Sequence, residues 1–211
     1  ITQTVSVLPS PMPGFTVNNL TQCLSGNSFV FTNTSTITPG TLSYSWNFGN
    51  GTTSTATNPT VSYAAAGTYT VTLIATSNSG CIDSIRQNVV VNSNASGSIS
   101  TPTSTIICEG SSVTLSARGG TTYQWALNGA NIAGATNPTY SATLPGVYSV
   151  LINNASGCSG TSSNTIALSL VRRPTADFTS TGSCASFPVI FSNQSTVSNS
   201  GIVTYSWTFG N

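Results

Sequence analysis

Hydrophobic and polar residues alternate along most of the chain, in short runs separated by turn residues. The segments TYTVTLIA (68–75) and VYSVLIN (147–153) carry apolar side chains at every second position, which is the period of a strand with one buried face. Pairs such as Asn50-Gly51, Asn128-Gly129 and Pro145-Gly146 lie between the runs and are typical of tight turns. No segment of useful length has the helical period. The pattern therefore predicts an all-β protein.

Ten segments have this strand pattern, and their spacing suits β-sandwiches arranged in tandem. The predicted strands are 28–32, 41–48, 61–63, 68–75 and 85–91, followed by 112–117, 122–127, 138–142, 146–153 and 164–171.

The first part of the sequence recurs near its end. YSWNFGN at 44–50 returns as YSWTFGN at 205–211, and FTNTST from Phe31 returns as FSNQST from Phe191. TQTVSVLPSPMPGF at 2–15 likewise matches TIALSLVRRPTADF at 165–178, and the offsets stay between 160 and 163 residues. A fixed period is the mark of an array of repeats. We expect the chain to cover about 1.3 repeats of two domains each, beginning inside one domain and ending inside another.

Two resemblances give these domains an identity. The signature WNFGNG at 46–51 and the run NPTVSYAAAGTYTVTL at 58–73 make residues 14–92 resemble a PKD (polycystic kidney disease) domain. That family has aspartates where this chain has Asn47 and Asn50, so both carboxylates of the motif are missing here.

The segments CEGSSVTLSA from Cys108, YQWALNG from Tyr123 and GVYSVLINNASGC from Gly146 resemble an immunoglobulin-like module of repetitive surface proteins in Bacteroidetes bacteria. Alternation of the two modules resembles the giant secreted adhesins and cell-surface filaments of that phylum. The resemblance implies tandem Ig-like β-sandwiches in a beads-on-a-string array.

The expected organisation follows from the repeat and the two resemblances. Residues 1–8 form the last strand of a preceding Ig-like domain, 9–13 a linker, 14–92 a PKD-like domain, 93–171 an Ig-like domain, 172–176 a second linker, and 177–211 the start of another PKD-like domain. The first strand either completes the sheet of a neighbouring subunit or continues from an N-terminal domain of the same chain. Both alternatives stay open.

Charge is scarce, and this narrows the possible chemistry. Only 3% of the residues are charged, histidine and lysine are absent, and the acids are Asp83, Glu109 and Asp177. The chain therefore lacks a general base for neutral pH, a metal-binding imidazole and paired carboxylates. We predict no enzymatic activity, no catalytic residue, no cofactor and no metal site. A net charge of +1 gives no footprint for nucleic acid, and no apolar run reaches the length of a membrane span.

An uncharged surface also lacks the usual protection against association, which has two explanations. Glycans cover the surface, or lateral contacts within a fibre bury it. Asp83-Ser84-Ile85 resembles the short O-glycosylation pattern of Bacteroidetes, so Ser84 is a weak candidate for modification. Lysine on an edge strand commonly prevents that strand from pairing with another chain, and this sequence has no lysine.

The aromatic residues have a structural and a binding interpretation. Trp46, Trp125 and Trp207 are favoured as core residues, since burying one such ring removes about 150–250 Å² from water. The alternative is a platform that stacks on sugars. Tyr69 and Tyr148 each begin a late strand after a glycine, where sandwiches commonly use the hydroxyl to fix a corner.

Five cysteines predict disulfides and hence an oxidising compartment. Domain membership and repeated context favour the pairs Cys23–Cys81 and Cys108–Cys158 among the three connectivities that four cysteines allow. Cys184 is the repeat counterpart of Cys23, and its own partner is expected beyond residue 211, which leaves it unpaired in this segment.

The sequence leaves two candidate functions, which belong to different classes of protein. The first is a structural repeat segment of a secreted extracellular fibre or adhesin, whose partners are neighbouring repeats, copies of itself, surface glycans or other cells. The second is a polysaccharide-binding or spacer region of a secreted multidomain enzyme.

Overall fold

A computed structural model describes residues 7–182, 188–197 and 204–209. The described residues form strands and no helix, as the alternating pattern predicted. They therefore contain no long apolar helix that could span a membrane. Chain contacts divide the molecule into two units. The first contains residues 1–95 together with 153–159, and the second contains the remaining residues.

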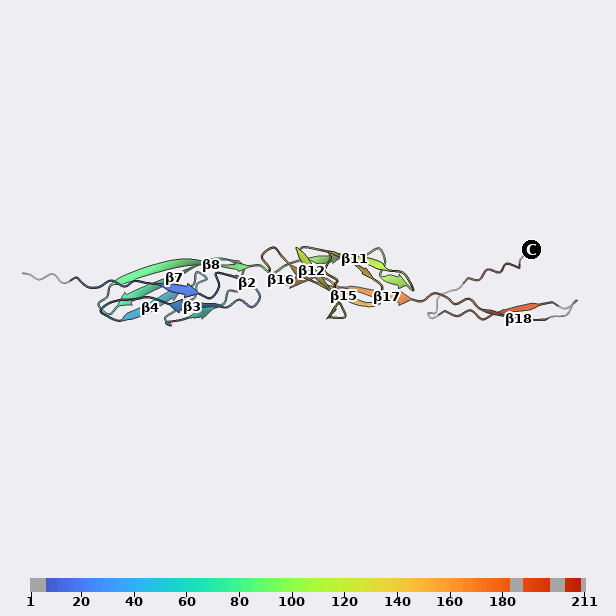
Figure 1. Cartoon of the computed structure of the whole chain (residues 1–211), viewed down its shortest axis with the longest axis horizontal. Coiled ribbons are helices and arrows are strands. Elements are labelled where there is room, and N and C mark those ends of the chain that lie inside the picture. Colours follow the sequence, from blue (N-terminus) through green and yellow to red (C-terminus); the bar gives the residue numbers. More distant parts are fainter. Residues whose placement is uncertain (1–6, 183–187, 198–203, 210–211) are drawn as a thin grey trace, which may run out of the picture. The chain divides into compact units, whose positions relative to one another are not determined.

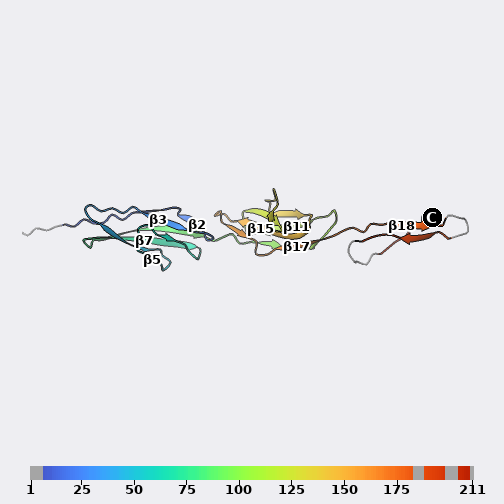
Figure 2. The ribbon, with the colours of Figure 1, turned by 90° about the horizontal axis from the view of Figure 1, so that it is seen from below.

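The first unit is a β-sandwich of two sheets. One sheet has the strand order β1-β3-β6 and the other β2-β8-β7-β4-β5, and Figure 2 shows β3 in one layer with β7 and β5 in the other. The strands are β1 (Phe15–Val17), β2 (Thr21–Cys23), β3 (Phe29–Asn33), β4 (Leu42–Asn47), β5 (Thr53–Ser54), β6 (Thr60–Val61), β7 (Gly67–Ser77) and β8 (Ile82–Asn92).

The longest elements of the first unit are β7 and β8, which form one antiparallel hairpin (Figure 1). Each has eleven residues. Val71, Leu73 and Ala75 of β7 are fully buried, and the residues between them are only partly buried. The alternation in the sequence therefore corresponds to one face of the hairpin packed on the core.

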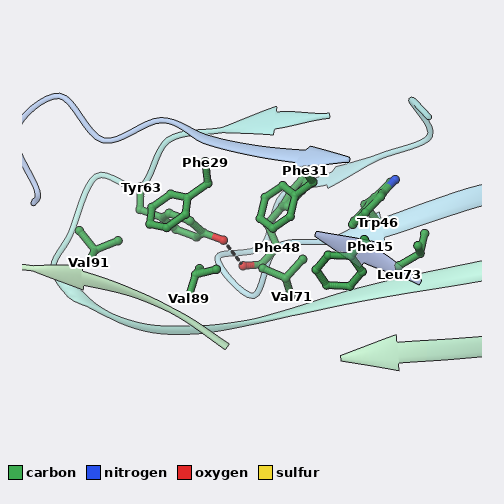
Figure 3. Close-up of a cluster of buried hydrophobic side chains, with 10 residues drawn as sticks. All are labelled: Phe15, Phe29, Phe31, Trp46, Phe48, Tyr63, Val71, Leu73, Val89 and Val91. Carbon is green, nitrogen blue, oxygen red and sulfur yellow. Dashed lines mark hydrogen bonds between the residues drawn. The ribbon is translucent and has the colours of Figure 1, made fainter. Parts of the chain in front are cut away.

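Aromatic rings fill the core of this sandwich (Figure 3). Trp46 of β4 is fully buried and contacts Phe15 edge-on, with the ring centroids 5.1 Å apart. Phe31 and Phe48 pack around the same indole. The indole N–H donates to the Ala56 carbonyl oxygen at 2.9 Å, so burial leaves its polar atom satisfied.

The second unit contains another sandwich of the same design. Its sheets have the orders β14-β11-β9 and β10-β17-β15-β12-β13, with β16 paired to β15. The strands are β9 (Ser98–Ser100), β10 (Ile106–Cys108), β11 (Val113–Arg118), β12 (Thr122–Leu127), β13 (Ala130–Asn131), β14 (Thr139–Ala142), β15 (Gly146–Asn153), β16 (Ser159–Thr161) and β17 (Ile166–Val171). Trp125 of β12 is fully buried and donates to the Asn137 carbonyl oxygen at 2.9 Å, as Trp46 does in the first sandwich.

The two predicted tyrosine corners are present. The Tyr69 hydroxyl donates to the Ala65 carbonyl oxygen at 2.8 Å, and the Tyr148 hydroxyl donates to the Leu144 carbonyl oxygen at 2.9 Å. Each bond spans four residues at the start of a central strand. The two tyrosines therefore have structural roles.

The last described strands repeat the beginning of the first sandwich. In β18 (Phe178–Thr181) and β19 (Ile190–Asn193), Phe178 lies opposite Asn193, as Phe15 lies opposite Asn33 in β1 and β3. The isolated bridge between Thr175 and Thr196 likewise corresponds to that between Met12 and Thr36. The sequence repeat is therefore also a repeat of backbone pairing.

Nine of the ten predicted strands are recovered, 122–127 and 146–153 with the predicted bounds, whereas 61–63 shares only Val61 with β6. The missed strands are β1, β2, β5, β9, β10, β13 and β16, together with β18 and β19. All but the last two have two or three residues, too few for an alternating pattern to appear. These short strands form because they pair with other strands, as β2 does in its parallel pairing with β8. Residues 1–6 of the expected first strand lie outside the described residues.

We predict that Trp46→Ala destabilises the first sandwich by about 3–5 kcal/mol, the range for large-to-small changes in a packed core. Chemical denaturation followed by hydrogen exchange of peptides from the first sandwich measures the change, because the remaining tryptophans, Trp125 and Trp207, lie outside that sandwich. Leu8→Ala is the control, since Leu8 is half-exposed and its loss leaves no internal cavity. A Trp46→Ala cost below 1 kcal/mol would contradict the central place of this ring.

A second prediction concerns alkaline pH. Burial, with a smaller contribution from the neighbouring Tyr69, raises the pKa of Tyr63 from 10.0 to about 12. The phenol donates to the Phe48 carbonyl oxygen at 2.9 Å (Figure 3), so the fold binds the protonated form. Below pH 10 this contribution is complete, and it is lost as the pH rises towards 12, because the unfolded chain releases its proton first.

Between pH 9 and 12 we expect the free energy of unfolding to fall by up to about 2 kcal/mol through this group. Denaturation series at several pH values measure the fall. Tyr63→Phe should show a shallower decline, although it loses the hydrogen bond at all pH values. An equal decline in both proteins would rule out Tyr63 as its source.

Candidate functional site

The end of the first sandwich where the chain leaves β8 carries a cysteine. Cys23 is the last residue of β2, which runs parallel to β8, and it lies opposite Asn92, the last residue of β8. The Leu24 amide donates to the Asn92 carbonyl oxygen at 2.8 Å. The parallel pairing therefore fixes Cys23 at this end of the sandwich.

Cys23 forms a disulfide with Cys158, with the two Cα atoms 5.5 Å apart. Cys158 lies in the loop between β15 and β16, and residues 153–159 group with the first unit by their contacts. The Asn154 side-chain amide also donates to the Ser93 carbonyl oxygen at 2.9 Å. Cys158 is fully buried, so the disulfide is part of a packed contact.

The predicted pairs Cys23–Cys81 and Cys108–Cys158 are therefore wrong. Cys81 precedes Ile82, at one end of β8, while Cys23 lies beside the other end. Eleven strand residues separate the two ends by about 30 Å, and a disulfide requires Cα atoms within about 7 Å. Cys81 therefore lies far beyond the reach of Cys23.

The second pair fails for the same reason. Cys108 lies opposite Val171, the last residue of β17. Strand β17 pairs with the Gly146 end of β15, so Cys108 lies towards that end of β15. Cys158 follows the opposite end of β15, about 20 Å away along the strand. Each sandwich therefore has its two cysteines at opposite ends.

Cys81 and Cys108 are free thiols, partly buried and exposed respectively. Cys184 lies outside the described residues, so its expected unpaired state is untested. The sequence did contain a signal for the turn positions, because Ser79-Gly80-Cys81 and Ser156-Gly157-Cys158 share the letters SGC. Domain membership gave no information about which end of a sandwich each cysteine occupies.

The tryptophans of the two complete sandwiches offer no surface for sugar. Trp46 and Trp125 are fully buried, so both are core residues, as favoured. Trp207 is 41% exposed and lines a groove of about 540 Å³ with Phe178, Phe191 and Phe209.

This groove has the geometry of the first core. Trp207 and Phe209 stack at 6.3 Å with 6° between their planes, as Trp46 and Phe48 stack at 6.4 Å and 10°. In the first sandwich Val71 and Val89, from β7 and β8, lie against this aromatic cluster (Figure 3). In the first sandwich, the β7–β8 hairpin covers the corresponding aromatic surface.

The asparagines of the WNFGNG motif act in the turn. The Asn47 side-chain oxygen accepts from the Gly49 amide at 2.9 Å, and the Asn50 side-chain oxygen accepts from the Thr52 amide at 3.1 Å. Both oxygens therefore shape the turn itself. Within the described ranges, no group of three histidine, cysteine or acidic residues gathers where it could hold a metal ion.

Ser84 lies on an exposed stretch of β8, at the edge of its sheet. Strand β2 pairs only with Val90–Asn92, so the described strands leave residues 82–89 of β8 without a neighbour on that side. Asp83 and Arg86 stand on this stretch and are exposed. Modification of Ser84 stays a prediction.

The cysteine geometry predicts a specific labelling pattern. Alkylation of the folded, unreduced 211-residue chain should label Cys81 and Cys108 and leave Cys23 and Cys158 unlabelled. Peptide mass spectrometry after a non-reducing digest should then find the peptides of Cys23 and Cys158 linked. Cys23→Ser is the matched variant, and Cys158, which is buried in the fold, should then be labelled when the unreduced chain is alkylated in denaturant. A linked peptide pair containing Cys23 and Cys81 would contradict the assignment.

Comparisons with known proteins agree with the first sandwich. Residues 11–93 match the sequence profile of the PKD domain family. A curated relative is the pre-pro-metalloprotease PrtV of Vibrio cholerae, 46% identical over 67 residues that make up 31% of this chain and 7% of that protein. The match thus spans a small part of the relative's length.

Two solved structures are similar over about two fifths of this chain. The PKD1 domain of Vibrio cholerae PrtV is 39% identical, with 39% of this chain and 98% of that domain covered and a TM-score of 0.36. The PKD1 domain of Vibrio anguillarum Epp is 33% identical, with 40% and 95% covered and a TM-score of 0.36. The family match shows that the chain contains a PKD domain at residues 11–93, and a second β-sandwich follows it in the sequence.

Proposed function

We propose that this chain is a structural, non-catalytic repeat segment of a secreted fibre or adhesin on a bacterial surface. The PKD domain and the Ig-like sandwich serve as stiff beads, joined by short proline-containing links such as residues 9–13 and 172–176. Their partners are the neighbouring repeats and further copies of the chain, with surface glycans or other cells as targets.

The observation that carries this proposal is the recurrence of the first half-sandwich. The Ser35 hydroxyl accepts from the Gly14 amide at 3.1 Å, and the Ser195 hydroxyl accepts from the Asp177 amide at 3.1 Å. The aromatic contacts around Trp46 recur around Trp207. A second PKD-like unit about 160 residues after the first supports a periodic array.

The Cys23–Cys158 disulfide supports an extracellular location, since such bonds persist in oxidising compartments.

The scarcity of charged residues supports contacts between copies of the chain. The open stretch of β8 carries Ile82, 65% exposed, and Ile85, 37% exposed. An unpaired strand edge with exposed isoleucines suits lateral association in a fibre better than it suits a free monomer.

The second candidate is a polysaccharide-binding or spacer region of a secreted enzyme. The likeness to a PKD domain of a metalloprotease favours the spacer form of this candidate. The binding form has less support, because Trp46 and Trp125 are buried. The exposed Trp207 occupies the position that Trp46 has in the core of the first sandwich.

Electron microscopy of the protein released from its native cell surface separates the two. We expect long unbranched fibres with a regular bead pattern and an intact mass many times that of the 211-residue segment. Compact particles that carry hydrolase activity would instead support the enzyme-associated candidate.

Glycan-array binding by the 211-residue chain tests the binding form. We expect no specific signal. Binding that is lost in Trp207→Ala and kept in a Tyr44→Ala control would favour a sugar-binding role.

A further inference from the structure

The two sandwiches hold cysteines at the same two structural positions. The first, called here the exit position, is the end of the short strand that runs parallel to the last strand of the sandwich. Cys23 lies there opposite Asn92, and Cys108 lies there opposite Val171. The residue after each cysteine donates its amide to the same opposing residue, at 2.8 Å from Leu24 and at 2.9 Å from Glu109.

The second, called here the turn position, follows the central strand β7 or β15. The Cys81 amide donates to the Ser77 hydroxyl at 3.0 Å, and the Cys158 amide donates to the Asn154 side-chain oxygen at 3.0 Å. The amides of Ser77 and Asn154 donate back to the two cysteine carbonyl oxygens, at 2.8 and 3.0 Å. The glycine before each cysteine has a positive φ, 84° and 76°. The two turns are therefore the same turn.

The observed disulfide joins an exit position to a turn position. Cys23 is the exit cysteine of the PKD domain, and Cys158 is the turn cysteine of the sandwich that follows it in the sequence. One exit cysteine, Cys108, and one turn cysteine, Cys81, are left free. The free pair consists of the same two kinds of position that bond in Cys23–Cys158.

Each free thiol lies at an end of its sandwich where the chain connects to a neighbouring domain of the proposed array, Cys108 at the end that leads to the following domain and Cys81 at the end that the chain enters from the preceding one. Cys108 is beside Val171, where the chain continues towards the second PKD-like unit. Cys81 is at the end where the chain enters the PKD domain. There Met12 pairs with Thr36, and the Thr41 carbonyl oxygen accepts from the amide of Asn78, three residues before Cys81.

We propose that Cys108 forms a disulfide with the turn cysteine of the PKD-like domain that follows it, and that Cys81 bonds to the exit cysteine of the Ig-like sandwich that precedes it. Every junction of the array then carries one disulfide between an exit position and a turn position. This proposal depends on the tandem array proposed above and adds its covalent connection.

The bond forms by oxidation of two thiols. They lose two protons and two electrons, and a disulfide-bonded oxidant, such as an oxidised thiol oxidoreductase or oxidised glutathione, takes them up and becomes a dithiol or two thiols. The exposure of Cys108 and the partial exposure of Cys81 leave both sulfurs accessible to exchange before the neighbouring domain docks.

The test compares the native protein with the isolated 211-residue chain. Both are alkylated without reduction, digested and mapped by mass spectrometry. In the native protein we expect Cys108 to be unlabelled and linked to a turn-cysteine peptide of a PKD-like domain. In the isolated chain, with the neighbouring domains absent, Cys108 and Cys81 should label at least tenfold more.

Two further measurements identify the source of the partner. If the partner belongs to the same chain, the intact mass stays unchanged on reduction apart from the added hydrogens. If it belongs to another copy, the mass falls to that of the single chain. In a native protein carrying Cys108→Ser, one turn cysteine should become labelled while the Cys23–Cys158 link remains, which serves as the internal control.

A fully labelled Cys108 in native fibres that retain the Cys23–Cys158 link would overturn the proposal and leave the fibre function intact. An intact native mass close to that of the 211-residue segment would instead overturn the array itself.

Discussion

Both sandwiches depend on the burial of one indole ring. Trp46 and Trp125 occupy the same place in their sheets, each is fully buried, and each donates its N–H to a backbone carbonyl oxygen ten or twelve residues later. The ring supplies the largest apolar surface that a small core can bury. Its hydrogen bond ties the loop after the strand to the core, so packing and loop position are fixed by the same residue.

A chain with almost no charge must satisfy its buried polar groups in another way. About a third of the residues are serine or threonine, and asparagine side chains act as substitutes for backbone groups. Asn27, which is 8% exposed, donates to the carbonyl oxygens of Leu24 and Tyr63 and accepts from the Tyr63 amide at 2.7 Å. One amide side chain thus bridges two loops where neither has a strand partner. The polar composition is therefore a structural requirement of the loops as well as a surface property.

The alternating pattern was sufficient to predict the long strands and the core tryptophans, because burial on one face leaves a direct trace in the sequence. It was insufficient for β2 and β10, whose three residues each take their place from a parallel partner distant in the chain. These two short strands decide which end of a sandwich Cys23 and Cys108 occupy. The error in the disulfide pairs came from this missing information, since cysteine count and domain membership contain no distances.

The Cys23–Cys158 bond also decides how the molecule responds when its ends are pulled apart. The bond bridges a sequence separation of 135 residues, which corresponds to about 450 Å of fully extended chain. Force that reaches Cys23 passes directly through the sulfur atoms to Cys158, so strands β3 to β15 lie outside the load path. Even if both cores melted, that length of polypeptide could not be drawn out, and the extensibility of the 211-residue segment is set by the 75 residues outside the covalent loop, 1–22 and 159–211.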